Sequence, residues 1–155
     1  MSPPTRTLPL VGCYTNACNL RNKWEDLNVA AIGSAFVAVT ETWLKADCDC
    51  SPLTPDGMTM YRIDRPGSTR GGGVALLIRG DIDHARGESL CSVGIQAMEI
   101  CLNTSAWNGS LINVYRSPCA SGEESALLVN WLGTRMRSAP NFIIMGISIH
   151  HKLIG

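Results

Sequence analysis

Polar residues that could act on a phosphate follow separate predicted strands. Glu41 comes directly after the apolar run 36–40, Asn16 follows an earlier strand, and Tyr115 ends a later one. A carboxylate is the hard oxygen ligand that Mg²⁺ prefers, an amide can orient a phosphate oxygen, and a phenol can donate a hydrogen bond to it. Ligands of open α/β sheets bind beyond the carboxyl ends of strands. These three residues, with the segment after Gly146, therefore form one candidate site.

Each of these residues has a simpler explanation when it is taken alone. A Glu at the end of a strand is commonly just solvated. A Tyr such as Tyr115 is commonly a half-buried strand aromatic. The prediction therefore depends on the combination of Asn16, Glu41 and Tyr115, and not on any one of them.

Arginines gather around a glycine-rich loop that could grip a phosphate chain. Arg62, Arg65 and Arg70 surround this loop, and Arg116 follows a later strand. Guanidinium groups and backbone amides bind phosphate oxygens, so these four residues are candidate nucleic-acid-binding residues. A flexible hairpin with solvated arginines is the alternative. The glycines 71–73 do not form a Walker loop, because no Gly-Lys-Ser/Thr follows them.

The first third of the chain predicts a strand–helix–strand unit. Residues 8–14 form a plausible strand and 36–41 a buried one, and between them apolar residues recur at helical spacing. The helical face consists of Leu20, Trp24, Leu27 and Ala31. A strand, a helix and a strand within some thirty residues predict a parallel pair.

Closely spaced strands follow and predict antiparallel pairing. They span residues 58–63, 73–79, 93–102 and 110–115. Together with the preceding unit they predict an α/β fold in which two mixed sheets pack face to face with helices outside.

The last predicted helix and strand close the second sheet. Ser121 and Glu124 have the spacing of a capping box that opens a helix, and Ala139-Pro140 ends it. Its core-facing residues are predicted to be Leu127, Leu128, Trp131 and Leu132. Residues 141–146 read as another buried strand.

Composition indicates one globular domain without a global charge field. The 155 residues are 45% hydrophobic with a formal net charge of zero, so polyanion binding would need a local basic patch. We expect a disordered segment at 1–7 and the domain at 8–155. No apolar run approaches the roughly 18 residues of a membrane span, and residues 1–6 do not resemble a signal peptide. We therefore expect an intracellular protein, nuclear or cytoplasmic and not secreted.

The seven cysteines lack metal-binding spacing. No C-x-x-C pair occurs, so we interpret them as buried or incidental free thiols of a reducing compartment. The alternative, a zinc site from Cys48, Cys50 and the His150-His151 pair, does not fit the usual ligand spacing.

Residues 10–146 contain a series of motifs whose order resembles that of a known protein family. The matching segments are Thr15-Asn16-Ala17, the helix 20–27, Thr40-Glu41-Thr42-Trp43-Leu44, Tyr61-Arg62, Arg70-Gly71-Gly72-Gly73-Val74-Ala75, the strand around Glu99, Asn113-Val114-Tyr115-Arg116-Ser117-Pro118, and Phe142-Ile143-Ile144-Met145-Gly146. In this order they resemble the endonuclease domain of non-LTR (LINE-type) retrotransposons. That domain is a branch of the endonuclease/exonuclease/phosphatase superfamily, which includes apurinic endonucleases and DNase I.

The resemblance implies a DNase I-like four-layer α/β sandwich and a Mg²⁺-dependent phosphodiesterase that nicks DNA. In such elements the nick primes reverse transcription by a downstream domain. By position, Glu41 would hold Mg²⁺, Asn16 would position metal and phosphate, and Tyr115 would contact the scissile phosphate.

The sequence departs from the family pattern in two places. Where the family continues as Gly-Asp-Phe-Asn, this chain has Ile147 and Ile149 in place of the acid and the amide. The family also continues to a Ser-Asp-His motif, whereas this sequence stops at Gly155, and His150-His151 stand at the wrong place in the order. We therefore expect a truncated, degenerate copy with lost or very weak activity. We also expect an incomplete sandwich that is monomeric or prone to aggregation.

A different class of function stays open at this point. A non-catalytic nucleic-acid-binding module would use Arg62, Arg65, Arg70 and Arg116 without a metal.

Overall fold

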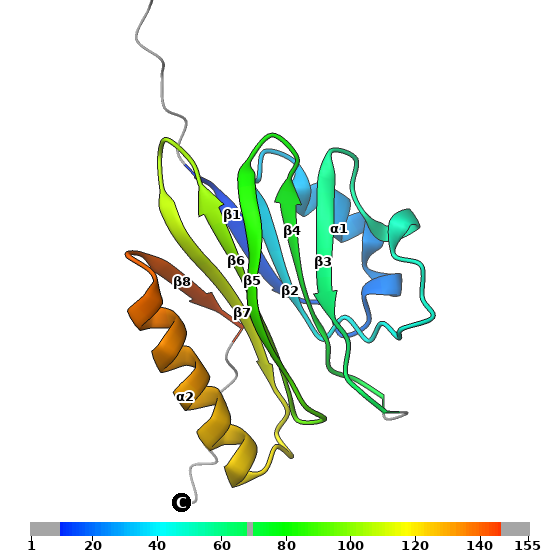
Figure 1. Ribbon diagram of the computed structural model, residues 1–155. Helices are drawn as coiled ribbons and strands as arrows, with labels where there is room; N and C mark the ends of the chain where they lie inside the picture. The colour runs from blue at the N-terminus through cyan, green and yellow to red at the C-terminus, as the bar shows by residue number, and fades with distance from the viewer. Residues whose placement is uncertain (1–9, 68–69, 147–155) are drawn as a thin grey trace, which may run out of the picture.

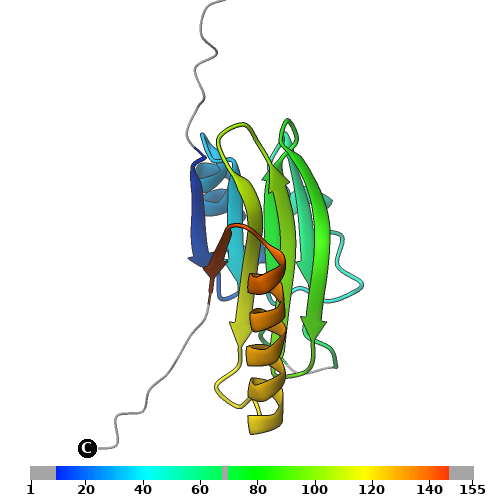
Figure 2. The same cartoon turned by 60° about the vertical axis from the view of Figure 1, so that its left-hand side comes forward.

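The computed structural model describes residues 10–67 and 70–146 and confirms the predicted α/β architecture (Figure 1). Two four-stranded sheets face each other, and each sheet contains both parallel and antiparallel pairs. Helix α1 (Trp24–Ala31) lies outside the first sheet and helix α2 (Gly122–Ser138) outside the second, so the layers run helix, sheet, sheet, helix (Figure 2).

The first sheet has the order β1-β2-β4-β3 and is built from residues 12–79. Its strands are β1 (Gly12–Asn16), β2 (Phe36–Thr40), β3 (Met58–Ile63) and β4 (Val74–Arg79). β1 and β2 are parallel, as predicted, and the other two pairs are antiparallel. A short 3₁₀ turn, η1 (Leu20–Asn22), precedes α1, and a second, η2 (Ser51–Leu53), interrupts the loop before β3.

The second sheet has the order β5-β6-β7-β8 and is built from residues 83–145. Its strands are β5 (Asp83–Cys91), β6 (Ile95–Asn103), β7 (Asn108–Arg116) and β8 (Phe142–Met145). β5, β6 and β7 form an antiparallel meander, and β8 returns after α2 to lie parallel to β7. The carboxyl ends of β7 and β8 therefore meet at one edge, as those of β1 and β2 do in the first sheet.

Side-chain alternation along the strands produces three apolar layers. Phe36, Ala38, Leu76 and Ile78 from the first sheet meet Met98, Ile100 and Leu111 from the second between the sheets. The opposite faces pack on the helices, with Val37, Val39 and Leu27 on the α1 side and Ile112, Val114 and Leu128 on the α2 side. β2 and β4 are therefore buried on both faces, which explains their unbroken apolar sequences.

Two fully buried amide side chains bridge the sheets. Asn113 Nδ2 on β7 donates to the carbonyl oxygens of Val39 at 2.9 Å and Ala75 at 2.8 Å. Gln96 Oε1 on β6 accepts from the backbone N–H of Gly73 at 2.8 Å. Most buried polar groups in proteins are hydrogen-bonded, and these hydrogen bonds fix how the two sheets dock.

The structure adds one strand that the sequence reading missed. β5 has mostly exposed side chains and a register shift between Arg86 and Ser89, so its sequence lacks an apolar alternation. The strand predicted to begin at Val93 begins instead at Ile95, because Ser92 N donates to Ile95 O and closes a turn there.

Four predicted core positions are wrong. Trp24 is 45% exposed and Leu127 57% exposed, so neither belongs to the buried face of its helix. The last strand is predicted to be buried, yet Phe142 is 40% and Ile143 37% exposed, because β8 pairs on one side only within the described residues. The predicted disordered segment 1–7 and the first two residues of the strand predicted at 8–14 lie outside the described residues.

The predicted capping box of α2 is present and extends further than the sequence suggests. Ser121 Oγ accepts from Glu124 N, and Glu124 Oε1 accepts from Ser121 N, both at 3.1 Å. The other carboxylate oxygen accepts from the Ser92 hydroxyl and from Gly94 N at 2.8 Å. These hydrogen bonds lower the pKa of Glu124 to about 2, and the hydrogen bond from Ser92 has the largest effect. The carboxylate therefore ties the start of α2 to the β5–β6 turn.

We expect Glu124→Gln to lower the free energy of unfolding by about 1 kcal/mol at neutral pH, as loss of a helix cap does. The folded pKa lies below the ordinary value of 4.5, so the carboxylate stabilises the fold above pH 4.5 and loses that contribution as pH falls toward 2. The difference between wild type and variant should therefore shrink below pH 4.5. Urea titrations at pH 7, 4.5 and 3 measure it, with Glu123→Gln as the control, and a difference constant across these pH values would contradict the prediction.

No helix in the described part of the chain is long and apolar enough to cross a membrane. The seven cysteines are free thiols, as predicted, but four are exposed and none is fully buried. The prediction that these cysteines are buried is therefore wrong, whereas the prediction that they are free thiols is confirmed.

Candidate metal and phosphate site

The backbone holds Glu41 at the junction of two loops. On one side Ala17 N donates to Thr40 O at 2.9 Å and Asn19 N to Glu41 O at 3.0 Å. On the other side Trp43 N donates to Gly72 O at 3.0 Å. Glu41 itself has a φ of 53°, a left-handed conformation that is unfavourable for a residue with a side chain and is often found at functional sites.

The site residues predicted from the sequence, Asn16, Glu41 and Tyr115, lie together at this edge. Tyr115 Oη from the second sheet donates to Glu41 Oε1 at 3.4 Å. Glu41 Oε2 accepts from Cys18 Sγ at 3.3 Å, and the same thiol contacts Asn16 Oδ1 at 3.1 Å. A carboxylate, an amide, a phenol and a thiol from the ends of three strands thus form one contact chain, the Glu41 cluster.

Two side chains of the Glu41 cluster, Tyr115 and Cys18, have raised pKa values. Burial is the main cause that raises the pKa of the Tyr115 phenol, and the negative charge of Glu41 raises this pKa further. The hydrogen bond to Glu41 is the main cause that raises the pKa of the Cys18 thiol, and desolvation raises this pKa further. Tyr115 is therefore a protonated hydrogen-bond donor at neutral pH.

The oxygen atoms of the Glu41 cluster fit Mg²⁺ in chemical type. Mg²⁺ in phosphate-processing sites is held by one or two carboxylates, keeps several waters and completes its shell with substrate phosphate. Glu41 would supply the carboxylate and Asn16 an amide oxygen. Across residues 10–67 and 70–146 no group of three or more His, Cys, Asp and Glu side chains is placed to hold a metal, so these two residues would bind it with help from substrate.

Two of the predicted phosphate-binding arginines lie beside the Glu41 cluster. The Arg65 guanidinium lies 5.8 Å from the centre of the Tyr115 ring, and its nitrogens donate to Val93 O and Arg70 O, both at 2.9 Å. The exposed Arg70 stacks on the indole of Trp43 at 4.6 Å. These contacts add positive charge and an aromatic face at the edge of the site.

The other two predicted arginines have intramolecular partners. Arg62 Nη2 donates to Lys45 O and Cys48 O at 3.2 and 2.8 Å, and its side chain lies 3.5 Å from Asp64. Arg116 Nε donates to Ser125 Oγ on α2 at 3.0 Å. Both side chains therefore brace loops and a helix in this structure.

Gly146 directly follows β8, close to the same edge. It has a φ of +85°, and a methyl group added there would lie 2.7 Å from Thr40 Cγ2 and 2.9 Å from Asn113 Oδ1. Asn113 Oδ1 is buried and has no hydrogen-bond partner among the described residues. Gly146 therefore lies against the end of β2, one residue before Glu41. Ile147, Ile149, His150 and His151, on which the sequence analysis placed its departures, lie outside the described residues.

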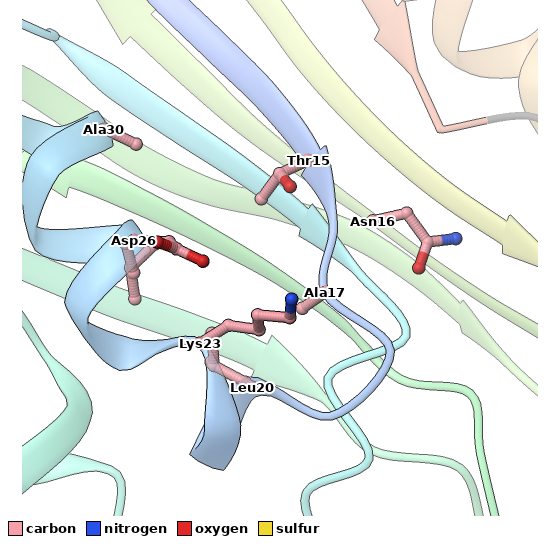
Figure 3. A pocket seen from close by; sticks show the side chains of 8 residues that line it. Thr15, Asn16, Ala17, Leu20, Lys23, Asp26 and Ala30 are labelled. Atoms are coloured by element: carbon pink, nitrogen blue, oxygen red, sulfur yellow. The ribbon is translucent and has the colours of Figure 1, made fainter.

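A small pocket lies beside the site on the other side of β1 (Figure 3). Lys23 and Asp26 from the start of α1 point into it below Thr15, whereas the Asn16 side chain points away from them (Figure 3). Asn16 is the one residue that the pocket lining shares with the Glu41 cluster, and Glu41, Cys18 and Tyr115 do not line the pocket.

Sequence reasoning missed Cys18 and the stacking partner Trp43. In the sequence Trp43 stands out only as part of the Thr-Glu-Thr-Trp-Leu motif, and Cys18 only as one of seven cysteines. One signal pointed to Cys18, namely its position two residues after Asn16, where a turn returns the side chain toward the strand end. Cys18 N donates to Asn16 Oδ1 at 3.2 Å in such a turn.

Comparison with known proteins identifies the fold. No protein-family model matches the sequence, and no curated protein matches it. Among solved structures, the endonuclease domain of TRAS1, a telomere-specific non-LTR retrotransposon, is similar with a TM-score of 0.63 and 17% identity, over 90% of this chain and 60% of that domain.

Two further structures share the same arrangement. An endonuclease/exonuclease/phosphatase family protein from Bacteroides thetaiotaomicron matches with a TM-score of 0.61 and 14% identity, over 95% of this chain and 67% of that one. The APE2 catalytic domain from Xenopus laevis matches with a TM-score of 0.58 and 17% identity, over 94% and 60%. The chain therefore has the DNase I-like fold of the endonuclease/exonuclease/phosphatase superfamily, and it spans about 60% of the length of the TRAS1 domain.

Proposed function

We propose that this chain is a retrotransposon-type endonuclease domain whose metal-dependent cleavage of DNA is strongly reduced. The observation that carries the proposal is the contact between Glu41 Oε1, after β2 of the first sheet, and Tyr115 Oη, on β7 of the second. It brings together the carboxylate that we propose to bind the metal and the phenol that we propose to bind phosphate. The similarity to the TRAS1 endonuclease domain supports the retrotransposon assignment. In that role the nick would prime reverse transcription at the target.

Each residue of the Glu41 cluster has a role in this proposal. Glu41 and Asn16 would hold Mg²⁺, which when bound neutralises charge on the phosphoryl and leaving oxygens. The protonated Tyr115 phenol would donate a hydrogen bond to the scissile phosphate. Arg70, exposed at the edge, would attract the DNA backbone.

The reduced rate follows from side-chain chemistry next to Gly146. The family sequence Gly-Asp-Phe-Asn places an acid and an amide there, and Ile147 and Ile149 replace them in this chain. An aliphatic side chain cannot activate the nucleophilic water, accept a proton or bind the transition state. Loss of such groups costs orders of magnitude in rate.

A Glu41→Gln substitution tests the site. We expect wild type to bind Mg²⁺ weakly and to nick supercoiled plasmid slowly, with EDTA and Glu41→Gln each abolishing the nicking, because the substitution removes the metal-binding charge. Calorimetry measures Mg²⁺ binding and gel electrophoresis measures nicking. Glu25→Gln, an exposed glutamate on α1, is the matched control.

Three results would contradict parts of the proposal. Nicking that survives Glu41→Gln would remove Glu41 from the site. Rapid nicking that needs Glu41 would overturn the reduced rate. Absence of Mg²⁺ binding together with absence of nicking would overturn the endonuclease assignment.

The stacked pair Arg70 and Trp43 favours a second candidate, a nucleic-acid-binding module without catalysis. Arginine and aromatic groups at a surface bind single strands through charge and stacking, and here Arg70 is exposed and Trp43 half-buried. DNA binding that is unchanged by EDTA and by Glu41→Gln, but falls with salt, would favour this candidate over the endonuclease.

A further inference from the structure

The guanidinium group of Arg65 is held by backbone oxygens and lies over the Tyr115 ring. Its Nε donates to Val93 O in the β5–β6 turn, and its Nη1 donates to Arg70 O, both at 2.9 Å. Its central carbon lies 5.8 Å from the centre of the Tyr115 ring, within the distance of about 6 Å at which an aromatic face attracts a cation. Arg65 follows β3 of the first sheet, whereas Tyr115 lies on β7 of the second. One side chain therefore joins the two sheets beside the Glu41 cluster.

The glycine-rich loop provides the space for this arginine. A Cβ atom at Gly72 would lie 2.8 Å from Arg65 Nε, and one at Gly71 would lie 3.3 Å from Arg65 Nη1. The φ angle is 70° at Gly72 and 97° at Gly71, a left-handed conformation that residues with a side chain rarely adopt. The glycines of the Arg-Gly-Gly-Gly motif therefore let the backbone close around the guanidinium group.

The Tyr115 ring needs a support of this kind if its hydroxyl group is to act on a phosphate. The hydroxyl group donates to Glu41 Oε1 at 3.4 Å, which is longer than a usual hydrogen bond between oxygens. Such a hydrogen bond orients the ring weakly, and misplacement of a reacting group by about 1 Å can cost about 100-fold in rate. The cation over the ring face adds a contact that limits how the ring can tilt.

Arg65 and Arg70 have different surroundings. Two of the three guanidinium nitrogens of Arg65 donate to carbonyl oxygens. The exposed guanidinium group of Arg70 stacks on Trp43 and makes no hydrogen bond or ion pair within residues 10–67 and 70–146. Arg65 is therefore held in place, whereas Arg70 is available to phosphate.

We propose that Arg65 is a positioning residue, which holds the Tyr115 ring with its hydroxyl group toward Glu41 and does not bind the DNA backbone. The inference rests on the proposed function, in which Tyr115 contacts the scissile phosphate. Arg65 then acts on nicking only through the phenol. Its planar fork is required, because the single ammonium group of a lysine does not reproduce the geometry of two guanidinium nitrogens on two carbonyl oxygens.

Fluorine NMR of protein labelled with 3-fluorotyrosine tests the contact without any activity. The chain has three tyrosines, Tyr14, Tyr61 and Tyr115, and the Tyr115 resonance is the one that Tyr115→Phe lacks. We expect Arg65→Gln to shift that resonance and to leave the other two unchanged. Arg65→Lys should shift it too, because lysine keeps the charge but not the fork, and Arg70→Gln should leave it in place.

Nicking rates show whether Arg65 acts through the phenol. We expect Arg65→Gln to slow Mg²⁺-dependent nicking of supercoiled plasmid about 10- to 100-fold, as displacement of a reacting group does. Added to Tyr115→Phe, the same substitution should cause no further loss, because the hydroxyl group through which it acts is already absent. A merely structural role of Arg65 would slow the double variant further.

DNA binding separates the two arginines. Loss of one phosphate contact lowers the slope of log affinity against log salt concentration by about one. Fluorescence anisotropy of a double-stranded oligonucleotide, with EDTA present, measures affinity and slope. We expect Arg70→Gln to weaken binding and lower the slope, and Arg65→Gln to leave both unchanged. Circular dichroism checks that each variant is folded.

Three results would overturn the inference. A Tyr115 resonance that stays in place in Arg65→Gln shows that Arg65 does not hold the ring. Weaker DNA binding with a lower slope in Arg65→Gln makes this arginine a backbone contact. A further loss of nicking in the double variant places its effect elsewhere. If wild type neither binds Mg²⁺ nor nicks DNA, the proposed function fails, and the fluorine resonance still decides whether Arg65 holds the ring.

Discussion

Replacement of Asn113 by leucine should lower the free energy of unfolding by about 2–4 kcal/mol. The side chain is fully buried and donates to two carbonyl oxygens of the opposite sheet, Val39 O and Ala75 O. Leucine has nearly the same volume but no donor, so both contacts between the sheets are lost, and a buried group left unpaired costs about 1–3 kcal/mol. Urea unfolding followed by circular dichroism measures the change.

The control for this variant is Asn108→Leu. Asn108 begins the same strand but is exposed, so its replacement should change stability by no more than about 0.5 kcal/mol. Equal destabilisation by the two substitutions would show that the buried amide does not hold the sheets together. A second expected result is that Asn113→Leu weakens Mg²⁺ binding, because Glu41 and Tyr115 lie on opposite sheets.

The double variant Ile147→Asp, Ile149→Asn should raise Mg²⁺-dependent nicking about 100-fold or more. It restores the acid and the amide of the family sequence after Gly146, and Gly146 lies against Thr40, the residue before Glu41. General acid–base groups contribute roughly 10²–10⁴-fold. Initial rates of plasmid nicking measure the gain, and addition of Glu41→Gln to the double variant should remove it.

A charge-matched control separates chemistry from added negative charge. Ile32→Asp introduces an acid at a side chain that is 79% exposed beyond α1, and it should leave nicking unchanged. If the double variant folds and binds Mg²⁺ but nicks no faster than wild type, the two isoleucines are not the cause of the low rate.

Much of the fold could be predicted because the buried strands have distinctive sequences. The runs 36–40 and 74–79 are apolar on both faces since each packs on a helix and on the opposite sheet. β5 escaped prediction for the opposite reason. As a mostly exposed strand its side chains are polar, so only tertiary pairing with β6 identifies it.

Helix faces were harder to predict than strands. Leu127 and Trp24 match helical spacing, but the position of a helix on its sheet decides which part of the apolar stripe is covered. Both helices carry more apolar side chains than the sheets bury, so Trp24 and Val29 of α1 and Leu127, Val129 and Met136 of α2 are exposed.

The candidate site could be predicted in part. Asn16, Glu41 and Tyr115 end strands, and strand ends that share an edge can be inferred from topology. The hydrogen bonds from Arg62 to Lys45 O and Cys48 O could not be predicted, because they depend on the path of a loop whose sequence has no regular pattern. Cys18 was missed because a thiol becomes informative only when its neighbours are known.

The division of the chain into two consecutive halves has a consequence for how the protein is made. Residues 12–79 build one sheet and 83–145 the other, so the carboxylate and the phenol of the site belong to segments synthesised one after the other. The nascent chain therefore carries the carboxylate before its phenol partner has been synthesised. The site requires the two sheets to pack on each other, and we expect loss of the Asn113 hydrogen bonds mainly to speed unfolding, as for contacts that form late in folding.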